Sequence, residues 1–240
     1  MFEGAVFADP VEGSPAGRHE VLADLQARIR RMQRNRLDTR ELPTDPALSG
    51  LLPGGALAAG GAYAVAGSTT LALGLLQAPS AAGAWCAVVG MPDLGVEAAA
   101  GLGIDLERLV LVPHPGEQWL TVVSALVDVV SVVLVRPAVR DGRVRITEST
   151  ASRLASRLRQ REAVLISAGD WPRADARLTV SGGSWAGIGS GFGHLAGRQV
   201  TVSSSSPHGR TVSRRLWLPG PDQRISAVEA REGQPLRSAG

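Results

Sequence analysis

Five short apolar runs, separated by segments with helical spacing, constrain the fold of this chain more than any other feature. The runs cover residues 62–66, 85–90, 109–113, 131–135 and 163–168. Strands that are apolar at nearly every position are typical of a sheet buried on both faces. The segments between the runs predict helices at residues 68–77, 94–102, 118–127 and 149–162. This alternation predicts an α/β fold with a mostly parallel central sheet covered by helices.

The N-terminal end departs from this alternation. Residues 1–18 are rich in Pro, Gly and acidic residues and predict a flexible arm. Residues 19–40 predict a helix with one apolar stripe and a basic C-terminal end. The helix either packs on its own domain with a solvated basic face or docks on another subunit or partner. Its candidate contact residues are Leu22, Leu25, Arg28, Ile29, Arg31 and Met32.

After about residue 170 the pattern changes to period two. Residues 177–181, 199–204 and 213–218 predict antiparallel strands. The glycine-rich segment 182–193 predicts a mobile loop or a set of tight turns. We therefore expect a core domain over residues 41–220 and a disordered tail over residues 221–240.

Composition limits the class of protein and its compartment. The chain has 240 residues, 44% of them hydrophobic, which suffices for one domain with a sizeable core. All 25 basic side chains are arginine, and the formal net charge is +3, which permits contact with nucleic acid without requiring it. Cys86 is the single cysteine, so an internal disulfide is excluded and a reducing compartment fits. The longest apolar run, residues 122–135, is too short to span a bilayer, and the N-terminus lacks a signal-peptide pattern. We expect a cytoplasmic protein without membrane contact.

Residues 62–71 have the frame of a phosphate-binding loop without its lysine. Such a loop, G-x-x-x-x-G-K-[ST], joins a strand to a helix. Here Gly67 holds the second glycine position, Thr69 holds the metal-hydroxyl position, and Ser68 stands where the lysine belongs. Ser68 and Thr69 could bind an anion through backbone amides at the helix start, or form only a turn between strand and helix. No cofactor is expected, although weak ATP binding stays open.

Four segments, in this order and at this spacing, resemble the core of RecA-type ATPases. They are Leu-Pro-Gly-Gly at 52–55, the loop at 67–73, Gly-Ile-Asp-Leu-Glu-Arg-Leu at 103–109, and Pro-Gly-Glu-Gln at 115–118. The resemblance covers about residues 48–170 and implies a RecA-like core. Three groups that phosphoryl transfer needs are missing at the matching positions. Ser68 replaces the lysine, the water-activating carboxylate falls near Met91 and Pro92, and Arg136 stands at the Walker B aspartate. The resemblance thus implies a degenerate loop and no enzyme, with Asp93 as the nearby carboxylate that could substitute.

Among degenerate RecA relatives, the chain most resembles the ImuA group, including the actinobacterial version called ImuA-prime. The arginine-rich segment before the core, Gly-Asp-Trp-Pro at 169–172 and Arg-Arg-Leu-Trp-Leu-Pro-Gly at 214–220 carry this resemblance. It implies an inactive accessory protein of SOS, damage-induced mutagenesis. Such a protein links ImuB, and through it a sliding clamp, with an error-prone C-family polymerase in translesion DNA synthesis. One alternative is a SulA-like cell-division inhibitor that binds a tubulin-like protein, and another is a divergent NTPase that uses Asp93. Self-association also stays open.

Aromatic and basic residues in the last third of the chain are candidate contacts. Trp185 and Phe192 could stack on exposed bases, or their segment could be a simple turn between strands. A second patch, for nucleic acid or a protein partner, comprises Arg210, Arg214, Arg215 and Trp217. The alternative for this patch is a solvated strand edge protected by charge. The four histidines and one cysteine show no metal-ligand spacing, so no metal site is expected.

Overall fold

A computed structural model describes residues 41–137, 139–140, 143–144, 146–188, 193–207, 209 and 211–228. The predicted N-terminal arm and docking helix lie outside these described residues. So do two of the candidate contact residues, Phe192 and Arg210.

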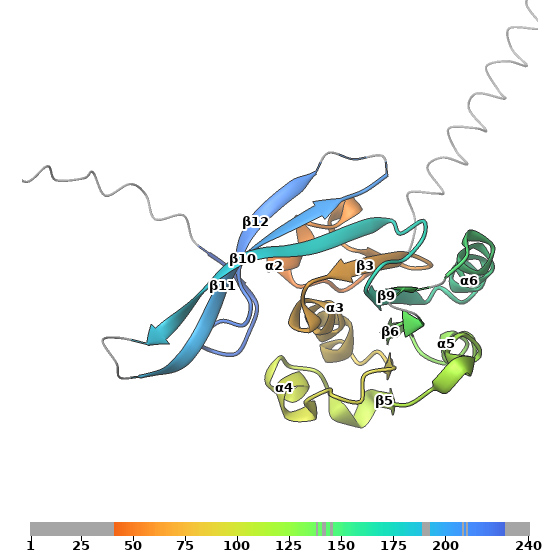
Figure 1. Ribbon diagram of the computed structural model, residues 1–240, viewed down its shortest axis with the longest axis horizontal. Helices are drawn as coiled ribbons and strands as arrows, with labels where there is room; N and C mark the ends of the chain where they lie inside the picture. Colours follow the sequence, from red (N-terminus) through yellow and green to blue (C-terminus); the bar gives the residue numbers. More distant parts are fainter. Residues whose placement is uncertain are drawn as a thin grey trace, which may run out of the picture. The chain divides into compact units, whose positions relative to one another are not determined.

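A nine-stranded sheet runs through the described part of the chain (Figure 1), in the order β13-β12-β11-β10-β3-β9-β6-β4-β5. Five neighbouring strands form its parallel part. They are β3 (Ala62–Ala66), β4 (Cys86–Val89), β5 (Leu109–Val112), β6 (Val132–Val135) and β9 (Val164–Ala168). These strands confirm the predicted α/β fold with a mostly parallel sheet.

The C-terminal strands extend the same sheet. β10 (Ala176–Ile188) pairs parallel to β3, and β11 (Gly193–Ser205) pairs antiparallel to β10. β12 (Val212–Trp217) and β13 (Ser226–Ala227) continue the antiparallel order. The predicted antiparallel C-terminal strands are therefore confirmed, and β10 joins the two parts of the sheet.

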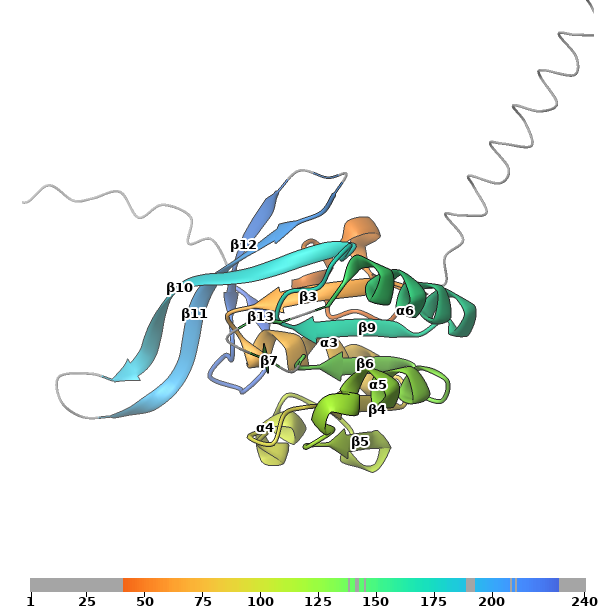
Figure 2. The ribbon, with the colours of Figure 1, turned by 45° about the vertical axis from the view of Figure 1, so that its right-hand side comes forward.

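Helices cover both faces of the parallel part (Figure 2). On one face lie α2 (Pro46–Ser49), α3 (Thr69–Ala81) and α4 (Val96–Gly101), which supply buried residues to one hydrophobic cluster. On the other face lie α5 (Trp119–Val127) and α6 (Glu148–Arg161), which supply a second cluster.

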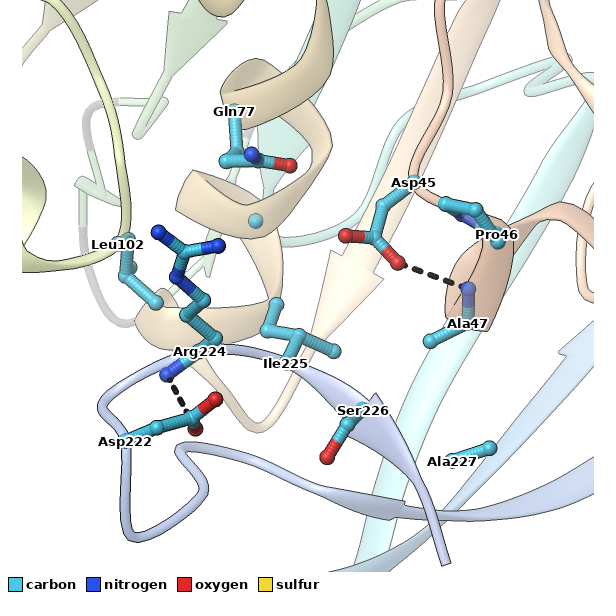
Figure 3. Close-up of a pocket in the computed structure, with 11 residues that line it drawn as sticks. Asp45, Pro46, Ala47, Gln77, Leu102, Asp222, Arg224, Ile225, Ser226 and Ala227 are labelled. Atoms are coloured by element: carbon cyan, nitrogen blue, oxygen red, sulfur yellow. Dashed lines mark hydrogen bonds between the residues drawn. The ribbon is translucent and has the colours of Figure 1, made fainter.

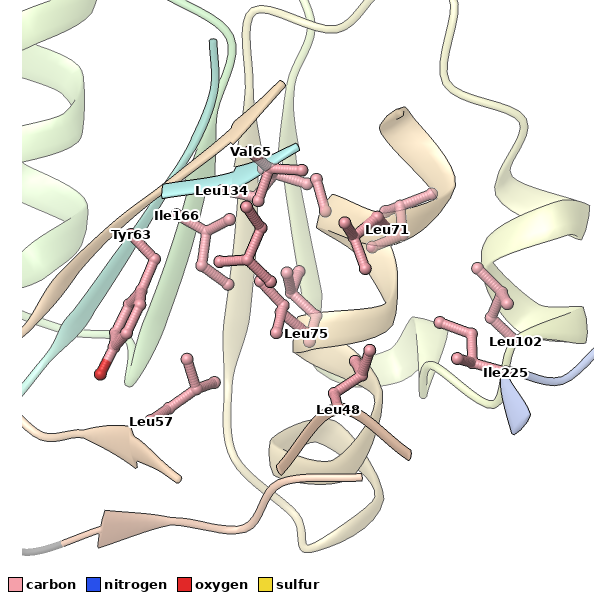
Figure 4. Packing of buried hydrophobic residues seen from close by; sticks show 14 of the residues in the cluster. Leu48, Leu57, Tyr63, Val65, Leu71, Leu75, Leu102, Leu134, Ile166 and Ile225 are labelled. Carbon is pink, nitrogen blue, oxygen red and sulfur yellow. The ribbon is translucent and has the colours of Figure 1, made fainter. Parts of the chain in front are cut away.

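Alternate residues of each parallel strand enter the two clusters. In β6, Leu134 packs with the α3 cluster (Figure 4), whereas Val133 packs with the α5 and α6 cluster. In β9, Ile166 and Leu165 divide in the same way. Because both faces are buried, nearly every strand position is apolar, and this is why these strands read as almost continuous apolar runs.

Short elements complete the described structure. Two two-stranded sheets are formed by β1 (Glu41–Leu42) with β2 (Leu57–Ala58), and by β7 (Val139–Arg140) with β8 (Arg143–Val144). Three 3-10 helices are η1 (Pro53–Gly55), η2 (Leu106–Arg108) and η3 (Gly116–Gln118).

Helix α3 is longer than the sequence predicted. The pattern placed its end at residue 77, with a break beginning at Pro79, but the helix continues through Pro79 to Ala81. Leu76, Pro79 and Ser80 are buried, so packing against the sheet outweighs the loss of one backbone hydrogen bond at proline.

The glycine-rich segment is neither a loop nor a set of turns over its first half. Residues 182–188 belong to β10, which pairs with β11 across register shifts between Ser181 and Ser184 and between Ala186 and Ile188. Gly182, Gly183 and Gly187 have positive φ angles. These glycines supply the backbone conformations that β-bulges require.

The prediction of disorder from residue 221 is wrong for residues 221–228. Ser226 and Ala227 pair with Trp217 and Leu216 of β12. Ile225 is only 9% exposed and packs into the α3 cluster. Burial of one apolar side chain and strand pairing stabilise this segment, and neither is visible in its local composition. The rest of the predicted tail lies outside the described residues.

Candidate functional site

The candidate site lies at the carboxyl ends of the parallel strands, where the phosphate-loop frame follows β3. Gly67 has φ 82°, and a Cβ atom there would lie 3.2 Å from the carbonyl oxygen of Val180. Both constraints favour glycine. Ser68 is the N-cap of α3, since its hydroxyl accepts a hydrogen bond from the Leu71 N–H at 3.1 Å. The predicted strand, loop and capped helix are all present.

Arg136 follows β6 and connects two residues of this edge. Its Nη1 lies 2.5 Å from Oδ1 of Asp93, in an ion pair, and its Nη2 donates to Oγ1 of Thr69 at 3.4 Å. The structure thus brings together three positions that the RecA resemblance singled out. They are the metal-hydroxyl position, the substitute carboxylate and the arginine at the Walker B position.

The backbone of Arg136 is held in place by the end of β4. Its N–H donates to the carbonyl of Val89 at 2.9 Å. Gly90 has φ 75°, and a Cβ atom there would lie 2.6 Å from the carbonyl oxygen of Arg136. Gly90 therefore permits the close approach that brings the guanidinium over the loop.

Asp93 and Asp170, two acidic side chains at this edge of the sheet, are each paired with an arginine. The hydrogen bond from Arg136 holds the pKa of Asp93 below its ordinary value of 3.8. The Asp93 side chain is 67% exposed and that of Arg136 is 34% exposed, so solvent screens the pair. Asp170, which follows β9, forms a second ion pair with Arg177 of β10. Among the residues that the structure describes, no group of three His, Cys, Asp or Glu side chains could hold a metal ion.

The aromatic and basic candidates of the last third lie on the antiparallel strands and not beside the loop. Trp185 is 53% exposed, and the Arg198 guanidinium lies 5.9 Å from the centroid of its ring. Arg214 and Arg215 are exposed on β12, and Trp217 is half-buried. In the sequence Arg198 only flanks the glycine-rich segment, and its position opposite Trp185 could not be predicted because it depends on the β10–β11 register.

The helix candidates cannot be placed, since they lie outside the part of the chain that the structure describes. These are Leu22, Leu25, Arg28, Ile29, Arg31 and Met32.

A cleft of about 450 Å³ lies between α2, α3 and residues 222–227 (Figure 3). Gln77, Leu102 and Arg224 line it, and Asp45 caps α2 at its rim by accepting a hydrogen bond from the Ala47 N–H at 2.7 Å. Sequence reasoning missed this cleft, because the segment that closes one side was expected to be disordered.

Residues 50–173, just over half of the chain, match the family described as the MT3502 N-terminal domain. The chain belongs to this family. An uncharacterized protein of Mycobacterium tuberculosis, Rv3395c, is 34% identical over 139 residues. That match covers 56% of this chain and 66% of the relative, so the chain spans just under two thirds of the relative's length.

One solved structure is similar in fold to this member of the MT3502 N-terminal domain family. The KaiC-like protein PH0186 of Pyrococcus horikoshii superimposes with a TM-score of 0.53 at 15% identity. The match covers 80% of this chain and all of that one. The RecA-like α/β fold is therefore confirmed. No helix within the described ranges combines the length and apolar character needed to cross a bilayer.

Proposed function

We propose that this chain is a catalytically inactive RecA-like accessory protein that binds protein partners in damage-induced mutagenesis. The observation that carries the first half of this proposal is the position of Arg136. Its guanidinium bridges Asp93 and Thr69 at the edge where a RecA-type ATPase would bind phosphates and magnesium.

Electrostatics supports the absence of phosphoryl transfer. Mg²⁺ requires carboxylate, hydroxyl or phosphate oxygens, and a guanidinium at the same place repels it. Asp93, the carboxylate that could substitute, is ion-paired with Arg136. Ser68 brings no positive charge to neutralise a γ-phosphate. Purified protein should therefore show no Mg²⁺-dependent ATP turnover above background and, at most, weak nucleotide binding.

The partner half of the proposal rests on the resemblance to ImuA and ImuA-prime. In this proposal the chain is cytoplasmic and binds ImuB, which connects it to a sliding clamp and an error-prone C-family polymerase. The stripe of Leu25 and Ile29, with Arg28 beside it, is the proposed contact. Apolar anchors surrounded by arginine are the composition that protein interfaces favour.

Co-purification with ImuB from the same cell tests this proposal. The full chain should form a stable complex, and a chain lacking residues 1–40 should not. A chain lacking residues 229–240 is the matched truncation, and it leaves β13 intact. Replacing both Leu25 and Ile29 with Asp should abolish the complex without altering thermal unfolding of the core.

Two outcomes would contradict the proposal. If well-folded full-length proteins form no complex, the mutagenesis assignment is wrong. Inhibition of a tubulin-like protein's polymerisation by the purified chain would then favour the cell-division inhibitor. If the Asp double variant binds ImuB at wild-type strength, the helix is not the contact.

A further inference from the structure

β10, β11 and β12 lie in a stretch of sequence without any carboxylate. Residues 176–220 contain five arginines, at positions 177, 198, 210, 214 and 215, and no Asp or Glu. The whole chain carries a formal net charge of only +3, so the remainder of the chain is net negative. β10, β11 and β12 thus carry four arginines and no carboxylate of their own, and of these arginines Arg177 is paired with Asp170.

Among the residues that the structure describes, no strand pairs with the outer edge of β10 beyond Thr179. β10 pairs with β3 only from Ala176 to Thr179, whereas its pairing with β11 continues to Ile188. The β10–β11 hairpin accordingly extends past β3 (Figures 1 and 2). Gly182, Gly183 and Ser184 are exposed along this edge. Residues this small allow another chain to approach the backbone closely.

One face of the hairpin offers a stacking surface. Trp185 is 53% exposed, and the Arg198 guanidinium lies 5.9 Å from its ring centroid. Arg198 also donates to the carbonyl of Gly182 at 3.3 Å, which fixes the guanidinium beside the ring. An exposed indole next to a cation can stack on a base and attract the adjoining phosphate.

The opposite face offers hydroxyl and guanidinium donors. Ser184 pairs with Gln199, and Thr201 pairs with Arg215, so alternation places these side chains on the face away from Trp185. They line a shallow hollow of about 280 Å³. Arg215 donates to Oε1 of Gln199 at 3.0 Å, and no carboxylate among the described residues is paired with it. Arginine and hydroxyl side chains are the usual partners of phosphate oxygens.

We propose that the open edge of β10 binds single-stranded nucleic acid. A base stacks on Trp185, and the sugar-phosphate backbone passes round the glycine-rich edge to Arg198 on one face and Arg215 on the other. A single strand is flexible enough to follow this path around the edge of β10 and across β11 to Arg215 on β12, whereas a duplex is too stiff. An acidic protein surface would use the arginines without using the exposed indole. This proposal does not depend on binding to ImuB.

Fluorescence anisotropy with the full chain and a labelled 20-residue oligothymidylate tests the proposal over a series of NaCl concentrations. The logarithm of the affinity should fall linearly with the logarithm of the salt concentration, by about 0.7 for each phosphate contact. Arg198→Gln and Arg215→Gln should each make this slope less steep by about one contact. Trp185→Ala should weaken binding about tenfold without changing the slope, and Trp185→Phe should retain most of the affinity.

Arg153→Gln is the matched control, because it removes the same charge from an exposed position on α6. It should leave both affinity and slope unchanged. The proposal is overturned if this control weakens binding as much as Arg215→Gln, or if Trp185→Ala binds normally. Tighter binding to a duplex of the same length, or to vesicles containing phosphatidylserine, would also overturn it.

Discussion

Arg136 is the residue that joins the elements of the candidate site. It lies between Asp93 and Thr69, and its backbone is fixed by the end of β4. The guanidinium is thus the ion-pair partner of the Asp93 carboxylate and a hydrogen-bond donor to the Thr69 hydroxyl.

Restoring the lysine alone should not restore nucleotide binding. With Ser68→Lys, two cations face the loop and magnesium is still repelled by Arg136. The double variant Ser68→Lys with Arg136→Asp supplies a lysine and a second carboxylate near Asp93, so measurable binding of magnesium ATP is expected. Isothermal titration calorimetry checks this, with Ser68→Lys combined with Arg153→Asp as the charge-matched control. Tight binding by Ser68→Lys alone would show that Arg136 does not block the site.

Ionisation of the Cys86 thiol should make the free energy of unfolding depend on pH. Burial in β4 raises the pKa of Cys86 from 9.0 to about 12. A raised pKa in the folded state contributes stability below pH 9 that is lost as the pH rises toward 12. The free energy of unfolding should therefore decrease between pH 8 and 9.5, and it should do so less in Cys86→Ala.

Thiol labelling provides the second measurement on Cys86. The folded protein at pH 8 should react with a disulfide reagent only at the rate of unfolding, because the buried thiol is both protonated and inaccessible. Complete labelling within seconds in native buffer would contradict the burial of Cys86.

At the scale of elements, the segment after β12 should contribute to the stability of the fold. Ile225 packs against α3 so closely that a Cβ atom on Gly74 would lie 2.0 Å from its Cδ1. Ile225→Ala should lower the free energy of unfolding by about 2 kcal/mol, through lost burial and a residual cavity. Urea unfolding measures this, and Val129→Ala, at a position that is 74% exposed, is the control expected to change little. Equal stability of the two variants would mean that this segment does not pack on the core in solution.

The elements of the parallel part could be predicted because burial on both faces leaves a local signature. The strands at Ala62–Ala66 and Val164–Ala168 are apolar at nearly every position, with Ser167 the polar exception in β9, and both end at the predicted residue. Period two predicted only part of β10 and β11, and it gave no sign of their extension through residues 182–188 and 193–198 or of β13. Their lengths depend on pairing between distant residues, such as Trp217 with Ser226.

The candidate site was predicted in part for the same reason. The loop at Gly67 and Ser68 is local in sequence, and its strand-to-helix turn was recognisable. Asp93 and Arg136 are 43 positions apart, and their ion pair follows only once β4 and β6 are neighbours in the sheet. Arg198 beside Trp185 needs the register of a bulged hairpin, which the sequence does not specify.

At the scale of the whole described chain, stability should be unevenly distributed. β6 and β9 lie inside the sheet with helices on both faces, whereas β10 beyond Thr179 pairs on one side only. Hydrogen exchange should therefore be slowest in β6 and β9, where it requires global unfolding. Exchange in residues 182–187 should be faster by at least a hundredfold, since local opening suffices. Equal protection in both regions would show that something covers the open edge.

β10 pairs with β3 on one edge and with β11 on the other, and this arrangement determines how the sheet carries a mechanical load. A load applied to the distal hairpin is carried along β10 to its four paired positions with β3, from Ala176 opposite Tyr63 to Thr179 opposite Ala66. These bonds lie across the direction of such a pull, so they bear it in shear and share the force. Gly67 follows β3 directly, and a Cβ atom there would lie 3.2 Å from the carbonyl oxygen of Val180 in β10. Tension on a strand held by the hairpin would thus reach the short loop at Gly67 and Ser68, which leads to Thr69 and its hydrogen bond with Arg136.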